Sequence, residues 1–119
     1  MIAEAETDPL QKRVSGQTLV SSRVAFVEVT KAVARVNAAA DPQPVLARFA
    51  FVELDAELAR VAAATGDATL RSLDAIHLAS AGRIGREIDA FVTYDDRQAA
   101  AARKLAFIVE APGLEGLTE

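Results

Sequence analysis

The stretch RSLDAIHLA, residues 71–79, decides the fold because it begins a helix that is apolar on nearly every side. We predict that this helix has its N-cap at Ser72 and runs to about Ile84, before Gly85. Apolar residues on all sides indicate a helix enclosed by other elements. Asp74 then points into the protein or into a cleft, where a carboxylate needs a partner or a metal ion. Its simpler role is that of a first-turn acid, which the helix dipole favours.

Short apolar stretches alternate with helical patterns along the rest of the chain. This alternation predicts an α/β domain with a largely parallel sheet. We expect strands at residues 18–20, 51–54, 90–94 and 107–109. Helices are expected at residues 2–14 and at residues 24–39, where the apolar stripe consists of Phe26, Val29, Val33 and Val36. A short helix is expected after Pro42, with Val45, Leu46 and Phe49. Two more are expected, one after a cap at Asp55 and one from Asp95 or Asp96 to Lys104.

Composition excludes several classes of protein and site. The 119 residues fit one domain, and 51% hydrophobic with 25% charged residues is typical of a globular chain rather than a disordered one. The absence of cysteine excludes disulfides, thiolate catalysis and cysteine-based zinc sites. No apolar run approaches the roughly 18 residues that span a bilayer, and the acidic start lacks the plan of a signal peptide. We therefore expect a cytoplasmic protein with no membrane partner.

Glu28 and Asp95 are two further candidate site residues. Glu28 lies off the apolar stripe of its helix, and its simplest role is a solvated carboxylate paired with Lys31. Asp95 follows a predicted strand and precedes a helix, so its simplest role is an N-cap. It also lies where ligands bind in open α/β sheets, beyond the carboxyl end of a parallel strand. Sequence periodicity alone does not show whether Glu28, Asp74 and Asp95 converge.

Carboxylates gathered at one sheet edge would suit a hard divalent cation. Magnesium and manganese prefer oxygen ligands, and such an ion polarises a phosphodiester and lowers the pKa of an attacking water. It would also offset the formal net charge of −4, which disfavours non-specific binding to nucleic acid. His77, the single histidine, is interpreted as a packed or hydrogen-bonded residue and not as a general base. One histidine and no cysteine give no convincing nucleophilic triad.

The order of these motifs resembles that of VapC-type PIN domains. LVSSRVAFVEV at residues 19–29 is similar to the second strand and acidic helix of that family, and residues 71–79 closely resemble its central acidic helix. FVTYDDR at residues 91–97 resembles its late strand and acidic end, and residues 107–113 are similar to its closing strand. The resemblance covers essentially the whole chain, and the segment around Asp74 is its most specific part.

This resemblance implies a fold and a function. The fold is a PIN-like α/β domain with a parallel sheet flanked by helices on both faces. The function is that of a toxin from a toxin–antitoxin pair, an endoribonuclease that depends on Mg²⁺ or Mn²⁺ and cuts RNA. A small cognate antitoxin and a homodimeric state are also implied. By match to the family's motifs, Glu28, Asp74 and Asp95 are the catalytic and metal-binding residues.

The start of the chain departs from the family pattern. Such proteins open with a short apolar strand that ends in an aspartate followed by small hydroxylated residues, whereas residues 1–6 already resemble the helix after that strand. We therefore interpret residues 1–119 as one N-terminally shortened PIN-like domain that lacks a central strand and one acidic ligand. Glu4, Glu6 and Asp8 follow the wrong element to replace it. A misassigned start, a truncation and real degeneration all remain open.

Two rival functions remain beside the ribonuclease. The first is a PIN-like binding module that still engages its antitoxin or dimer partner but no longer cuts RNA. The second is a flavodoxin-like regulatory domain, which is disfavoured because no acidic pair ends an N-terminal first strand.

Overall fold

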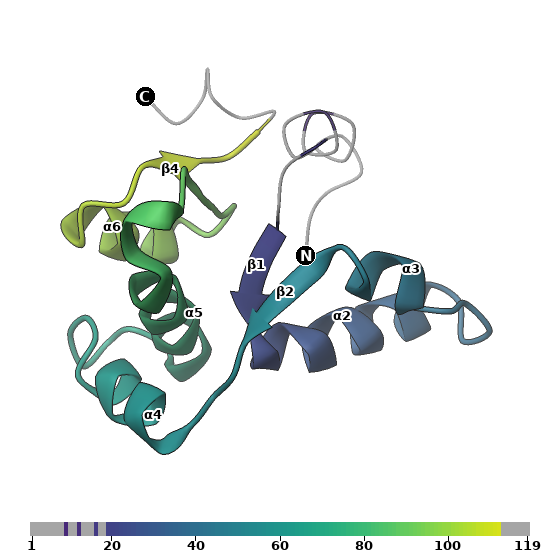
Figure 1. Ribbon diagram of the computed structural model, residues 1–119, viewed down its shortest axis with the longest axis horizontal. Coiled ribbons are helices and arrows are strands. Elements are labelled where there is room, and N and C mark those ends of the chain that lie inside the picture. Colours follow the sequence, from purple (N-terminus) through teal and green to yellow (C-terminus); the bar gives the residue numbers. More distant parts are fainter. Residues whose placement is uncertain (1–8, 10–11, 13–15, 17–18, 113–119) are drawn as a thin grey trace.

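Helices and strands alternate in the computed structural model, which describes residues 9, 12, 16 and 19–112 (Figure 1). The elements in chain order are β1 (Leu19–Ser22), α2 (Arg23–Val36), α3 (Gln43–Leu46), β2 (Phe49–Val52), α4 (Ala56–Ala63), α5 (Ser72–Ile84), the 3₁₀ turn η1 (Gly85–Glu87), β3 (Phe91–Val92), α6 (Asp96–Lys104) and β4 (Val109–Glu110). The helix predicted at residues 2–14 lies largely outside the described residues, although Pro9 and Lys12 are helical.

The strands pair in parallel, which confirms the predicted α/β fold. Strand β1 pairs with β2 in a register that joins Leu19 to Phe49 and Ser22 to Val52. Strand β3 pairs with β4, joining Phe91 to Val109. Within the described part of the chain, each pair is a two-stranded sheet of its own, and no ladder joins the two pairs. Figure 1 shows β1 and β2 beside α2, while β4 lies with α5 and α6 in the other half of the molecule.

Phe49 is the clearest error in the predicted boundaries. We expected it in the short helix after Pro42, but that helix ends at Leu46 and Phe49 begins β2. Alternate residues of a strand share a face, and the rings of Phe49 and Phe51 stack on each other with centroids 5.9 Å apart. The strand therefore begins two residues earlier than the predicted strand at residues 51–54, and it ends two residues earlier, at Val52.

Two helix ends also differ from the prediction. Helix α2 stops at Val36, because the side chain of Asn37 accepts a hydrogen bond from the Ala39 N–H (3.0 Å) and so forms a local turn. Helix α5 has Arg71, not Ser72, at its N-cap. The Arg71 carbonyl already accepts the first helical hydrogen bond, from the Ala75 N–H at 2.9 Å. Asp74 still lies in the first turn.

The predicted cap of α4 is confirmed, and it also ties α4 to α5. The Asp55 carboxylate accepts a hydrogen bond from the Leu58 N–H (2.8 Å) and two from the Arg83 guanidinium on α5. The guanidinium of Arg83, followed by the Leu58 N–H, lowers the pKa of Asp55 to about 2. An ion pair therefore joins α5 to the start of α4, in addition to apolar packing.

Helix α5 is enclosed, as its sequence predicts. It contributes to both clusters of buried apolar residues, of which one contains Val52, Leu58, Ala62, Ala75 and Ala79, and the other contains Leu78, Ala81, Phe91 and Ala102. Helix α2, in contrast, buries none of its residues. The part of the chain that the structure describes holds no helix of the length and apolar character needed to cross a membrane.

Candidate active site

Asp74 combines partial burial with acidic neighbours from two other parts of the chain. Burial raises the pKa of Asp74, and the negative charge of Asp95 raises it further, with a smaller contribution from Glu28. Arg71 and His77 act in the opposite direction. No hydrogen bond from the described residues reaches this carboxylate, so its charge is balanced only through space. The charges of the other two predicted acids therefore act on Asp74.

Asp95 caps α6, as predicted. Its Oδ1 accepts hydrogen bonds from the backbone N–H groups of Arg97 (2.9 Å) and Gln98 (3.0 Å). The Gln98 N–H is the largest cause of a lowered pKa of Asp95, and the Arg97 N–H contributes less. Neither bond involves Oδ2, so the cap leaves an oxygen for another partner. Capping and ligand binding are thus compatible roles for this residue.

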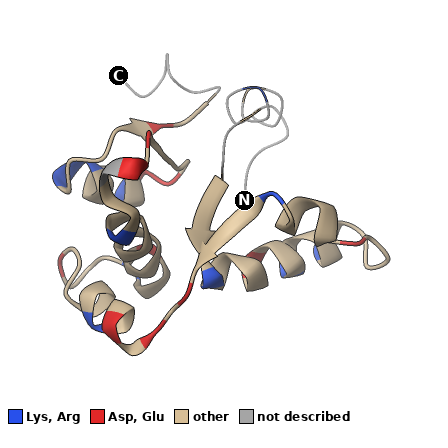
Figure 2. Cartoon of the chain, viewed as in Figure 1, with Lys and Arg blue, Asp and Glu red and all other residues tan. Residues whose placement is uncertain are grey.

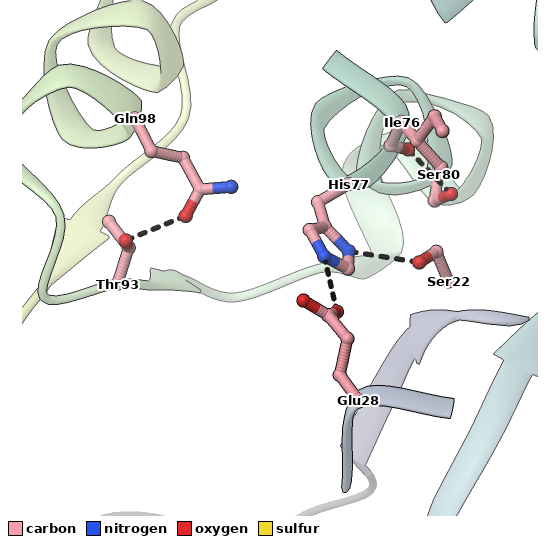
Figure 3. A network of polar contacts seen from close by, with 7 residues as sticks. All are labelled: Ser22, Glu28, Ile76, His77, Ser80, Thr93 and Gln98. Atoms are coloured by element: carbon pink, nitrogen blue, oxygen red, sulfur yellow. Dashed lines mark hydrogen bonds and ion pairs between the residues drawn. The ribbon is translucent and has the colours of Figure 1, made fainter. Parts of the chain in front are cut away.

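The turn that carries Asp95 is fixed by two buried polar side chains that the sequence analysis missed. The Thr93 hydroxyl donates to Gln98 Oε1 at 2.7 Å (Figure 3). It also accepts from the Asp95 N–H at 3.1 Å. Thr93 and Gln98 are 8% and 9% exposed, so water does not compete for these bonds. Gln98 stands three residues after the cap, the spacing of a capping box, and this signal in the sequence could have drawn attention to it.

Glu28 lies on α2 and is bonded to α5. Its Oε1 is 3.0 Å from His77 Nε2, and the side chains of Glu28 and His77 are 46% and 20% exposed. The opposite ring nitrogen, Nδ1, is 2.9 Å from the hydroxyl of Ser22 at the end of β1. The predicted pairing of Glu28 with Lys31 is therefore wrong, because a histidine 49 residues away reaches the carboxylate instead. His77 is hydrogen-bonded, as expected.

Arg71 acts on both aspartates of this site. Its positive charge lowers the pKa of Asp74 and of Asp95, and Arg97 also lowers the pKa of Asp95. No pattern in the sequence distinguishes Arg71 from the other arginines, because its effect on Asp95 depends on how α5 and α6 pack. The charge of Arg71 therefore favours the ionised form of both carboxylates.

The donor chemistry of the site fits a hard divalent cation, but the grouping is incomplete. Carboxylate oxygens are the ligands that Mg²⁺ and Mn²⁺ prefer, and a divalent ion would relieve the repulsion between Asp74 and Asp95. Among the described residues, however, no three His, Cys, Asp or Glu side chains form a group that could hold an ion. Asp74 and Asp95 are the residues that would hold it, and the Glu28 carboxylate is hydrogen-bonded to the His77 ring.

Comparison with known proteins identifies the family. The PIN domain family matches residues 3–104, a range that includes Glu28, Asp74 and Asp95. Over 95% of its length the chain is 37% identical to "Ribonuclease VapC47" of Mycobacterium tuberculosis (strain CDC 1551 / Oshkosh), of which 89% is covered. The chain is a VapC-type PIN-domain protein.

Other relatives agree with this assignment. This VapC-type chain is 39% identical to "Ribonuclease VapC35" of Mycobacterium tuberculosis (strain ATCC 25618 / H37Rv) over 92% of its own length and 87% of that protein. A shorter match to "Ribonuclease VapC46" of the same strain is 54% identical over 43 residues, which is 36% of the chain and 33% of the relative. No solved structure matches the chain.

Proposed function

We propose that this VapC-type protein is a metal-dependent endoribonuclease toxin that cleaves RNA phosphodiesters and is held by a small antitoxin. The observation that carries the proposal is the PIN domain match over residues 3–104, which contains the acids Glu28, Asp74 and Asp95. The charges of Asp95 and Glu28, which raise the pKa of Asp74, support it. The names of the relatives, all ribonucleases, support the choice of RNA.

The three acids have different tasks in this proposal. Asp74 and Asp95 hold Mg²⁺ or Mn²⁺, and Glu28 completes the acidic set. When bound, the ion supplies a Lewis acid for the phosphodiester and lowers the pKa of an attacking water. The α6 N-terminus lowers the pKa of Asp95, which favours its ionised form, and Arg71 opposes the effects that raise the pKa of Asp74.

RNA binding in this proposal relies on the ion and not on a basic surface. The formal net charge is −4, and in the described part of the chain Lys and Arg are spread over several elements, among them α2, α4, α5 and α6, without gathering in one place (Figure 2). A divalent ion presents local positive charge to a phosphate even on an acidic protein. We therefore expect weak RNA binding when the ion is removed.

The proposed antitoxin engages the same acids. The partly buried carboxylate of Asp74 and the exposed one of Asp95 suit an inserted Arg or Lys from a partner, which would form charge-assisted hydrogen bonds. Co-purification with the product of the neighbouring open reading frame tests this pairing. A homodimeric state, a single domain over residues 1–119 and a cytoplasmic location also remain predictions.

The enzymatic activity is tested by cleavage of a structured RNA in Mg²⁺ or Mn²⁺, with EDTA as the control. We expect EDTA-sensitive cleavage that falls strongly in Asp74→Asn and Asp95→Asn. Asp96→Asn is the matched control for Asp95→Asn. Asp96 is an exposed acid in the first turn of α6, next to Asp95, and is not one of the proposed site residues. Equal activity of Asp74→Asn and the unmodified chain would reject the proposal.

A second candidate function is a PIN-like binding module that engages its antitoxin or dimer partner without cutting RNA. The observation that favours it is the absence of a closed metal-binding group among the described residues. A chain that co-purifies with its antitoxin but shows no EDTA-sensitive cleavage would support this alternative.

A further inference from the structure

Arg23, the first residue of α2, lies over two aromatic rings. Its guanidinium carbon is 4.7 Å from the ring centroid of Phe51 on β2 and 5.6 Å from that of Phe26 on α2. The Phe51 ring stacks on the ring of Phe49 and meets the ring of Phe26 edge to face, with centroids 5.9 Å apart in both pairs. One guanidinium and three rings therefore form a connected group, the Arg23 cluster, between α2 and β2.

Glu53 fixes the guanidinium at the end of this cluster. Arg23 Nε donates to both carboxylate oxygens of Glu53, at 3.0 and 3.2 Å, and Nη2 donates to Oε2 at 2.6 Å. Nη1 takes part in none of these three bonds. A planar fork with a carboxylate at one edge and rings beside it is preorganised. The Arg23 side chain is nevertheless 44% exposed, so part of this fixed planar group faces solvent.

The charge of the ion pair indicates which ligand suits this surface. A phosphate that approached Arg23 would also meet the carboxylate of Glu53, which is 63% exposed and bonded to the same guanidinium. Arg23 and Glu53 together carry no net charge, which favours a neutral ligand over an anion. A nucleobase is neutral and planar, and unpaired bases of RNA stack on guanidinium planes and aromatic rings. The Arg23 cluster therefore suits a base and not the RNA backbone.

The cluster lies at the end of β1 that also meets the start of α5. Arg23 and Glu53 directly follow Ser22 and Val52, the paired last residues of β1 and β2. Ligands of open α/β sheets bind beyond such carboxyl ends of parallel strands. Ser22 Oγ is also 2.9 Å from His77 Nδ1 in the second turn of α5 (Figure 3). The beginning of α5, which carries Asp74, thus lies at the same end of β1 as the Arg23 cluster.

We propose that the Arg23 cluster is a base-binding subsite, in which one unpaired base of the RNA substrate stacks on the exposed guanidinium of Arg23. This inference rests on the proposed ribonuclease function and adds a substrate class, RNA with an unstacked base beside the cleaved bond. A base stacked on a protein side chain commonly contributes roughly 5- to 150-fold to affinity. The subsite is neutral, so it selects RNA by its bases while the proposed metal ion interacts with the phosphate.

The decisive experiment pairs one change in the protein with one change in the RNA. The probe is a structured RNA with a single-stranded loop, together with copies in which one loop nucleotide at a time is abasic. At one loop position, removal of the base should raise the KM of Mg²⁺-dependent cleavage by the unmodified chain about tenfold. The effect should appear in KM more than in kcat, because a stacked base binds alike before and during cleavage.

Arg23→Lys should abolish this dependence on the base. Lysine keeps the positive charge and the pairing with Glu53, but it lacks the plane on which a base stacks. The variant should therefore cut the intact and the abasic RNA with the same raised KM. Arg35→Lys is the matched control, since Arg35 is an exposed arginine in the last turn of α2, and it should keep the full dependence.

The other outcomes overturn the inference in distinguishable ways. If Arg23→Lys keeps the tenfold dependence, or if no abasic position changes the KM of the unmodified chain, the base-binding subsite is wrong and the ribonuclease function stands. If Arg23→Lys loses its antitoxin in co-purification and keeps the dependence on the base, the cluster binds a protein instead. Absence of any EDTA-sensitive cleavage by the unmodified chain would overturn the proposed function and this inference together.

Discussion

Helices α2 and α5 have nearly the same length, 14 and 13 residues, but opposite relations to the core. Helix α2 carries the regular apolar stripe of an amphipathic helix and yet buries none of its residues. Helix α5 has apolar residues on nearly every side and buries five, namely Ala75, Leu78, Ala79, Ser80 and Ala81. Apolar periodicity therefore predicts a helix, but the elements that surround a helix determine how much of it becomes buried.

The same contrast divides the candidate site. Asp74 and His77 lie on α5, which has five buried residues, while Glu28 lies on α2, which has none that is fully buried. A carboxylate on a loosely packed helix needs a second restraint to be held in place, and the hydrogen bond from His77 supplies one. Three predictions test whether the two helices differ in this way, and they run from the largest expected effect to the smallest.

The first prediction compares truncations on the two helices. Leu78 on α5 is 1% exposed and Val36 on α2 is 82% exposed. Leu78→Ala should lower the free energy of unfolding by about 2–5 kcal/mol, because it leaves a cavity in the core. Val36→Ala should change it by no more than about 0.5 kcal/mol. Urea unfolding of both variants measures the difference, and equal losses would mean that α2 is as buried as α5 in solution.

The second prediction asks whether a metal ion joins the two helices. Mn²⁺ at about one hundred times its Kd would add about 2.7 kcal/mol to the free energy of unfolding. If Glu28 is a ligand, Mn²⁺ should slow amide hydrogen exchange in α2 as well as in α5 and α6, and EDTA should reverse the effect. Glu28→Gln is the control, since it keeps the shape of the side chain and removes its charge. Slower exchange in α5 and α6 alone would show that Glu28 does not bind the ion.

The sequence predicted most of the helices and strands, because their signals are local. The apolar pattern of α5 and the two aspartates at the start of α6, the cap Asp95 and the first helical residue Asp96, are each contained within a few residues, and both helices form as expected. Phe49 was assigned to the wrong element because no turn signal in the sequence separates the short helix from the strand that follows it. In the structure Phe49 belongs to that strand and stacks on Phe51. Short apolar segments are compatible with either type of element until tertiary packing decides.

The sequence proposes a set of site residues but not their arrangement. The resemblance to VapC-type PIN domains selects Glu28, Asp74 and Asp95, which stay a prediction, and the effect of Asp95 and Glu28 on the pKa of Asp74 depends on packing that no local pattern encodes. The bond between His77 and Glu28 spans 49 positions of the chain, and the approach of Arg71 to Asp95 likewise joins separate elements. Contacts of this kind follow from the tertiary fold, so the partner nearest in sequence, Lys31, was the wrong choice for Glu28.

The last prediction concerns Asp74 on α5 and Asp95 at the start of α6, whose pKa values shift in opposite directions. Backbone N–H groups lower the pKa of Asp95, so its ionised form stabilises the fold, and this contribution is lost as the pH falls through its folded pKa. Burial and nearby acids raise the pKa of Asp74, so its ionised form opposes folding, and this penalty disappears as the pH falls below the ordinary range of aspartate. At neutral pH without metal, Asp95→Ala should therefore cost about 1 kcal/mol, the usual value of an N-cap. Asp74→Asn should leave the stability unchanged or raise it.

Urea unfolding between neutral pH and pH 3, in EDTA, tests both signs at once. In acid the two variants should approach the unmodified chain from opposite sides, Asp95→Ala from lower stability and Asp74→Asn from equal or higher stability. Asp95→Asn should lose less than Asp95→Ala, because asparagine also caps helices well. A clear loss of stability in Asp74→Asn at neutral pH would mean that the Asp74 carboxylate is itself a structural partner in the folded protein. The partial burial of Asp74 would then serve packing and not the binding of an ion. The contrast between α5 as a buried helix that carries a metal ligand and α2 as an exposed one would no longer hold.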